Sequence, residues 1–149
     1  MLPRGKVRRV FAFVVDDLWM KFEYIHYTRM ALQKFVESQM QPGDLVAIMQ
    51  TKGWNAGLHT FSSDKRQLLA RISNLRWSTL RGPNLQPIGL PQISAIVYSI
   101  KALQDMPGRK FLLLVSTLFR QGQAKFIGVL GLALHILEIT VCLPLLRIK

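Results

Sequence analysis

The sequence predicts an α/β fold, a doubly wound and mostly parallel sheet with one antiparallel edge strand. Two observations predict it. Short runs of β-branched and aromatic residues alternate along the chain with segments in which apolar residues recur at helical spacing. The main runs are apolar at nearly every position, which is typical of strands that helices cover on both faces. The order strand, helix, strand, strand, helix, helix, strand then favours parallel pairing.

The first strand and the first helix are expected before residue 44. Residues 7–15 form an apolar run that two aspartates end. From residue 22 we expect an amphipathic helix of about five turns, and Pro42-Gly43 ends it. The expected apolar face of this helix comprises Phe22, Ile25, Leu32, Phe35, Val36 and Met40.

Two strands and a second helix are expected next. Residues 44–51 form a second apolar run, and turn residues lead from it into a short third run, Leu58–Phe61. A short connection between two strands predicts antiparallel pairing, so the third run is the expected edge strand. Asp64 supplies an N-cap for a second helix, which we expect to end around Arg76-Trp77.

The last expected elements follow a loop. Residues 78–91 are rich in Pro, Gly and Asn and predict that loop. Apolar residues from Ile93 to Leu103 predict a third helix. Phe111–Val115 is a fourth strand, as apolar as the first.

The tail does not continue the pattern, so we divide the chain into a domain at residues 1–118 and a tail of uncertain structure at residues 119–149. In Phe126–Leu146 only His135 and Glu138 are ionisable. This segment has three interpretations: a buried helix plus strand, a membrane segment, or a sequence outside the ancestral domain, whose C-terminal part would then be incomplete. A central glutamate disfavours a membrane span.

Composition excludes a disordered basic polymer. The 149 residues carry a formal net charge of +12, yet 50% are hydrophobic and the mean hydropathy is +0.21. A single cysteine, Cys142, excludes an internal disulfide. The apolar run after the basic start is too short for a signal peptide, so we expect no signal peptide and leave the location open.

Enzyme motifs are missing from the sequence. It contains no phosphate-binding loop, no dinucleotide-binding glycine pattern and no nucleophile elbow. His26, His59 and His135 have no partners at metal-ligand spacing. We therefore expect a protein that is not an enzyme.

Polar residues that follow the expected strands are the candidate site. Asp16 and Asp17 end the first strand, Thr51 ends the second, and Ser116-Thr117 follow the fourth. Ligands bind beyond the carboxyl ends of parallel strands, and adjacent carboxylates can ligate Mg²⁺. The alternative is that either aspartate caps the following helix or accepts from loop amides.

Basic residues are candidate anion sites at three places: Arg4, Lys6, Arg8 and Arg9 at the start, Lys65-Arg66, and Arg109-Lys110. No aromatic residues alternate with them as in a nucleobase-stacking surface. The other interpretation is an ordinary solvated surface. The excess charge lies in residues 65–149, with 12 basic and 2 acidic side chains.

Four segments resemble the von Willebrand factor type A (VWA) domain, and more narrowly the VWFA-related branch that is common in Acidobacteria. They are residues 9–18, 35–48, 61–68 and 103–110, which contain Phe-Val-Val-Asp-Asp, Pro-Gly-Asp-Leu-Val-Ala-Ile, Phe-Ser-Ser-Asp and Pro-Gly-Arg-Lys. The likeness covers about residues 7–118. It implies a bacterial, doubly wound α/β domain that binds proteins or serves in adhesion, and whose relatives are often exported.

The resemblance also implies a metal-ion-dependent adhesion site. Asp16 matches the first position of its Asp-x-Ser-x-Ser motif, but Leu18 and Met20 replace the serines. Ser116-Thr117 stands where the family has an aspartate, and residues 82–92 hold no threonine. We therefore expect a degenerate site, with Asp16 and Asp17 binding Mg²⁺ or another divalent cation weakly or not at all.

Two functional hypotheses follow. The first is a non-catalytic protein-interaction module whose partner binds at Asp16, Thr51, Trp19 and Trp54, although both tryptophans suit packing at the helix–sheet boundary equally well. The second is a basic protein that binds nucleic acid or an anionic membrane through residues 65–149. Under the first hypothesis the protein partner is unknown, no nucleic acid is expected, and a membrane contact depends on the tail at 126–146.

Overall fold

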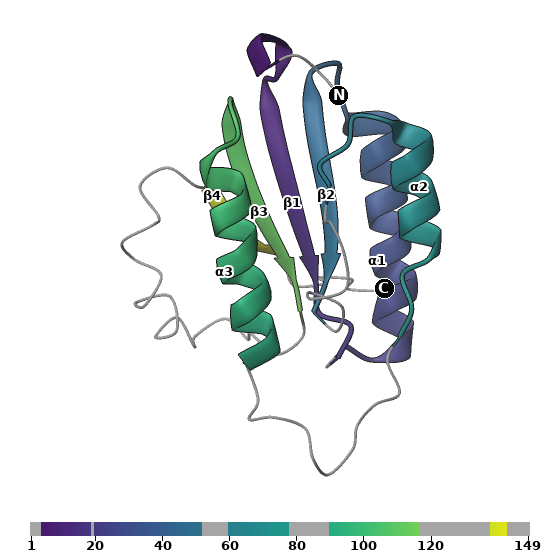
Figure 1. Ribbon diagram of the computed structural model, residues 1–149. Helices are drawn as coiled ribbons and strands as arrows, with labels where there is room; N and C mark the ends of the chain where they lie inside the picture. Colours follow the sequence, from purple (N-terminus) through teal and green to yellow (C-terminus); the bar gives the residue numbers. More distant parts are fainter. Residues whose placement is uncertain (1–3, 19, 52–59, 78–89, 117–137, 143–149) are drawn as a thin grey trace.

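A computed structural model describes residues 4–18, 20–51, 60–77, 90–116 and 138–142, and it is an α/β fold (Figure 1). Four parallel strands form one sheet in the order β2-β1-β3-β4. The strands are β1 (Arg9–Val15), β2 (Asp44–Gln50), β3 (Arg109–Val115) and β4 (Glu138–Cys142). The coarse prediction of a largely parallel sheet with helices on both faces is confirmed.

The predicted antiparallel edge strand is not present among the described residues. Residues 58 and 59 lie outside them, Thr60 and Phe61 are not assigned to a strand, and the next residue, Ser62, makes an antiparallel bridge with Val46. The extended chain ends there because Asp64 caps a helix two residues later. Its side chain accepts from the backbone N–H groups of Arg66 and Gln67.

Within the described ranges three α-helices cover the sheet: α1 (Phe22–Lys34), α2 (Lys65–Ser73) and α3 (Leu90–Gln104). The 3₁₀ turn η1 (Arg4–Lys6) precedes β1, and the π-helical turn η2 (Phe35–Gln39) continues α1. α2 ends at Ser73, three residues before the predicted Arg76. Asn74 is its C-cap, and the N–H of Leu75 donates to the carbonyl of Ile72, three residues earlier, which closes a tighter turn than an α-helix has. α3 begins at Leu90, within the predicted loop; residues 78–89 lie outside the described part.

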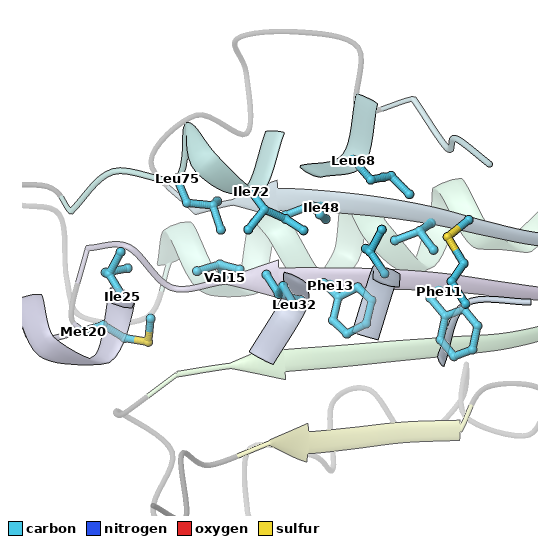
Figure 2. Packing of buried hydrophobic residues seen from close by; sticks show 13 residues of the cluster. Phe11, Phe13, Val15, Met20, Ile25, Leu32, Ile48, Leu68, Ile72 and Leu75 are labelled. Atoms are coloured by element: carbon cyan, nitrogen blue, oxygen red, sulfur yellow. The ribbon is translucent and has the colours of Figure 1, made fainter. Parts of the chain in front are cut away.

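The two faces of the sheet have separate apolar cores. α1 and α2 pack on the face that presents Phe11, Phe13 and Val15 (Figure 2), and α3 packs on the opposite face. Successive residues of β1 therefore point alternately into the two cores, and β1 is buried on both faces. The side chains on the α3 side include Val10, Ala12, Val14, Ala47, Ile96, Leu103 and Leu112.

The strand register aligns the ends of β1, β2 and β3. Arg9 is level with Asp44 and Arg109 at one end, and Val15 is level with Gln50 and Val115 at the other. Because all three strands are parallel, the residues that follow them meet at one edge. The residues that precede them meet at the opposite edge.

Five residues of the tail join the sheet. β4 pairs in parallel with β3, from Phe111 opposite Glu138 to Val115 opposite Cys142. In the part of the chain that the structure describes, no helix has both the length and the apolar character needed to cross a bilayer. The rest of the segment 126–146 lies outside that part.

Candidate functional site

The candidate site is the carboxyl edge, which we define as Asp16, Asp17, Gln50, Thr51 and Ser116. β1 positions the two aspartates, β2 positions Gln50 and Thr51, and β3 positions Ser116. These strands are neighbours in the sheet, so residues up to 100 positions apart in sequence come into contact. The predicted convergence of Asp16, Asp17, Thr51 and Ser116 is present; Thr117 lies outside the described residues.

Each carboxylate oxygen of the carboxyl edge accepts a hydrogen bond. Ser116 Oγ donates to Asp16 Oδ2 at 2.6 Å, and Gln50 Nε2 donates to Asp17 Oδ2 at 3.2 Å. Thr51 Oγ1 lies 2.9 Å from Asp17 Oδ1 and 3.3 Å from Asp16 Oδ1. A hydroxyl has one proton, so the two carboxylates share a single donor at Thr51.

Backbone hydrogen bonds fix the same residues. The N–H of Asp16 donates to the carbonyl of Val115 at 2.9 Å, and the N–H of Thr51 donates to the carbonyl of Val15 at 3.1 Å. The carbonyl of Asp16 accepts from the N–H of Met20 and closes a turn after β1. The side chains of the edge are thus attached to a backbone that the sheet itself orders.

Capping of the first helix by Asp16 or Asp17 is wrong as an explanation of these acids. The N-cap of α1 is Lys21, and no side chain makes a hydrogen bond at that cap. Both aspartates instead bond to side chains of neighbouring strands. These hydrogen bonds link the ends of neighbouring strands.

Burial makes this network energetically demanding. Asp16, Thr51 and Ser116 have no solvent-exposed surface, and Asp17 is 2% exposed. An ionised carboxylate in such a place depends on its hydrogen-bond donors, because a buried charge without partners costs several kcal/mol. The donors of the carboxyl edge are therefore structural as well as candidate functional groups.

The residues at the edge do not fit the adhesion-type metal site that the VWA resemblance implies. Met20 stands at a serine position, and its thioether is fully buried in the core between α1 and the sheet (Figure 2). Leu18 stands at the other serine position, and Ser116 replaces the far aspartate and donates to Asp16. Mg²⁺ prefers oxygen ligands, and within the described ranges no three His, Cys, Asp or Glu side chains gather as a metal-binding group.

An aromatic pair beside the carboxyl edge was missed by the sequence analysis. Phe22 was expected on the buried face of α1, but it is 66% exposed. Its ring meets the ring of Trp77 edge to face at 6.1 Å, and Trp77 Nε1 donates to the carbonyl of Met20 at 2.9 Å. The buried face of α1 is centred on Ile25 and Leu32, and Phe22 in the first turn lies against Trp77 instead.

Trp19 and Trp54, the predicted partner anchors, lie outside the described residues. The Phe22–Trp77 pair has no local sequence signal, since its members are 55 positions apart and meet only when α1 and the chain after α2 are in place. From the sequence, Trp77 could have been singled out only because a buried indole N–H usually needs a hydrogen-bond acceptor.

Comparisons of the chain with protein-family models, with curated proteins and with solved structures found no match. The likeness to VWA domains therefore depends on the four quoted segments alone.

Proposed function

We propose that this chain is a non-enzymatic protein-interaction module of the VWA type, and that its partner binds at the carboxyl edge. The observation on which the proposal depends is the convergence of Asp16, Thr51 and Ser116 from three adjacent strand ends. Ligands of open α/β sheets bind beyond the carboxyl ends of the strands. A fully hydrogen-bonded buried network rigidifies its surroundings, and here it orders the strand ends beside the proposed binding surface.

The solvent exposure of each side chain indicates its part in binding. Asp16 and Thr51 are buried, so they act as positioning residues that order the strand ends. Phe22 is exposed and rests on Trp77, which makes this pair a suitable anchor for a partner, because aromatic side chains dominate the energetics of many interfaces. The partner we expect presents an apolar pocket or ridge to Phe22.

Metal is not needed for this mode of binding. We expect Mg²⁺ or Mn²⁺ to bind weakly or not at all, because the oxygens of Asp16 and Asp17 already accept from Ser116, Gln50 and Thr51. Isothermal titration of the full chain with each cation measures this. A micromolar affinity that Asp16→Ala abolishes would show that the site is a metal site after all.

The partner site is tested by affinity capture from the source cells with two matched variants. Phe22→Ser removes the exposed aromatic side chain at the edge, and Met30→Ser removes an apolar side chain of α1 that is 53% exposed away from it. The proposal predicts that a specific protein is retained by the original chain and by the Met30 variant, and lost by the Phe22 variant. Equal retention by all three chains would contradict it.

A further inference from the structure

Three segments meet around Arg8 at the edge opposite the candidate site. The backbone N–H of Arg8 donates to the carbonyl of Gly43 at 2.9 Å, and the N–H of Arg109 donates to the carbonyl of Arg8 at 2.9 Å. We call residues 4–9, 41–44 and 105–110 the amino edge, because they lie where β1, β2 and β3 begin (Figure 1). The basic residues at 4–9 and at 109–110, far apart in sequence, are thus neighbours.

Two glycines make this close approach possible. Gly43 has φ +93°, and a Cβ there would lie 2.8 Å from the backbone oxygen of Lys6. Gly108 has φ +84°, and a Cβ there would lie 2.6 Å from the backbone oxygen of Arg8. Both conformations are strained for other residues. The two glycines therefore allow the turns at residues 41–44 and 105–110 to pack closely against the backbone of residues 6–8.

The amino edge is strongly basic. Its three segments contain six Lys and Arg residues against two Asp. Asp44 is already engaged, since it accepts from Arg9 Nε at 2.9 Å, from Arg9 Nη2 at 2.6 Å and from the N–H of Gln41 at 2.8 Å. This hydrogen bonding raises the pKa of Arg9. The other five Lys and Arg residues outnumber the second acid, Asp105, so the amino edge keeps a net positive charge.

An open hollow of about 540 Å³ lies in the amino edge. The described residues that line it include Lys6 and Arg8 and no acidic residue; they are Gly5, Lys6, Arg8, Gln41, Pro42 and Gly43. A volume of this size falls within the range of small-molecule pockets, roughly 300–1,000 Å³. Lys6 and Arg8 both line the hollow, and two cationic donors suit a multiply charged anion.

We propose that the hollow binds a small anion that carries two or more phosphate groups, held by Lys6 and Arg8. Among the described residues of the lining there is no aromatic side chain on which a nucleobase could stack. Among the described residues the large exposed hydrophobic side chains are Phe22, Met30, Val97 and Tyr98, and none of them lines the hollow. These two observations favour a compact anion over a nucleic-acid strand or a lipid surface.

The test is isothermal titration of the full chain with inorganic pyrophosphate at low ionic strength. Lys6→Ala combined with Arg8→Ala should weaken binding at least tenfold, because both cations of the lining are lost. The matched control is Lys21→Ala combined with Arg76→Ala, which removes two exposed cations that do not line the hollow and should leave affinity within twofold. Circular dichroism melting confirms that both double variants fold.

Three outcomes would overturn the proposal: no pyrophosphate binding, equal weakening in the two double variants, or full binding after loss of Lys6 and Arg8. Duplex DNA and phosphatidylserine vesicles are titrated in parallel. Binding of either one in the absence of pyrophosphate binding, with sensitivity to the Lys6 and Arg8 substitutions, would assign the edge to an extended polyanion and refute the small-anion site. The site lies at the opposite edge from the proposed partner site, so its failure would leave the proposed function untouched.

Discussion

The two edges of the sheet use charge in opposite ways. At the carboxyl edge, two adjacent acids are buried and hydrogen-bonded to uncharged side chains. At the amino edge, an acid is buried beneath a guanidinium and further cations stand in solvent around a hollow. The same parallel register aligns both sets of residues. A parallel register thus brings like charges together at either end of the sheet, and the difference between the two edges is how much of each set is buried.

Asp16→Ala is expected to have the largest effect. It removes the acceptor of the 2.6 Å hydrogen bond from Ser116 and one of two acceptors of Thr51. Because the lost acceptor is buried and its hydrogen bonds link three strand ends, the free energy of unfolding should fall by about 2–3 kcal/mol. Urea denaturation measures this. The matched control is Asp64→Ala, an exposed helix cap, which should cost about 1 kcal/mol; an Asp16 effect below that of Asp64 would show that the carboxyl edge is not structural.

Asp44→Ala is the equivalent test at the amino edge. The carboxylate accepts from Arg9 twice and from the N–H of Gln41. Arg9 keeps 30% of its side-chain surface in solvent, so it can be hydrated after the loss, and we expect a decrease of about 2 kcal/mol. A decrease larger than that of Asp16→Ala in the same denaturation experiment would reverse the ranking of the two edges.

Gly43→Ala should lower the free energy of unfolding by about 1–2 kcal/mol, because alanine is strained at φ +93° and its Cβ would press on the backbone of Lys6. Gly5→Ala is the matched control, since a Cβ there meets no atom within 4 Å. Thermal unfolding of both variants checks the prediction. Equal melting temperatures would mean that the turn at residues 41–43 can move away from residues 6–8.

Arg9→Lys is expected to have the smallest effect, about 0.5–1 kcal/mol, because lysine cannot donate through two nitrogens to Asp44. The pKa of Arg9 is raised by its hydrogen bond to Asp44. A group with a raised folded-state pKa contributes stability below its unfolded pKa and loses it only as pH rises through the folded one. The difference between the two proteins should therefore stay constant from pH 7 to 10, and a difference that vanishes by pH 9 would contradict this assignment.

Much of the sheet could be predicted because its strands are apolar on both faces. Residues 7–15 and 111–115 indicate buried parallel strands by composition alone, and the position of Asp16 after the first of them places it at the carboxyl edge. The predicted antiparallel strand at residues 58–61 is only partly testable, because residues 58 and 59 lie outside the described part; next to it the structure has an antiparallel bridge between Val46 and Ser62. The local residue pattern indicates where a strand can form, but it does not determine how many of its residues pair with a neighbouring strand.

The rest of the two edges depends on contacts between distant segments. Phe22 satisfies the apolar spacing of α1 as well as Ile25 does, yet it lies against Trp77 and in solvent. The basic residues at 4–9 and 109–110 were visible as separate groups. Their meeting at Arg8 requires the left-handed conformations of Gly43 and Gly108, which become necessary only when the strand register is known.

The π-helical turn η2 gives the segment between α1 and β2 an unusual tolerance in length. The N–H of Met40 donates to the carbonyl of Phe35, five residues earlier, at 2.9 Å. An α-helical turn would span the same hydrogen bond with one residue fewer. Ser38 is exposed, whereas Val36 and Met40 on either side of it are buried. A chain that lacked Ser38 could therefore close this turn as ordinary α-helix and keep both core contacts, so η2 is a place where the sheet can accommodate the deletion of a single residue.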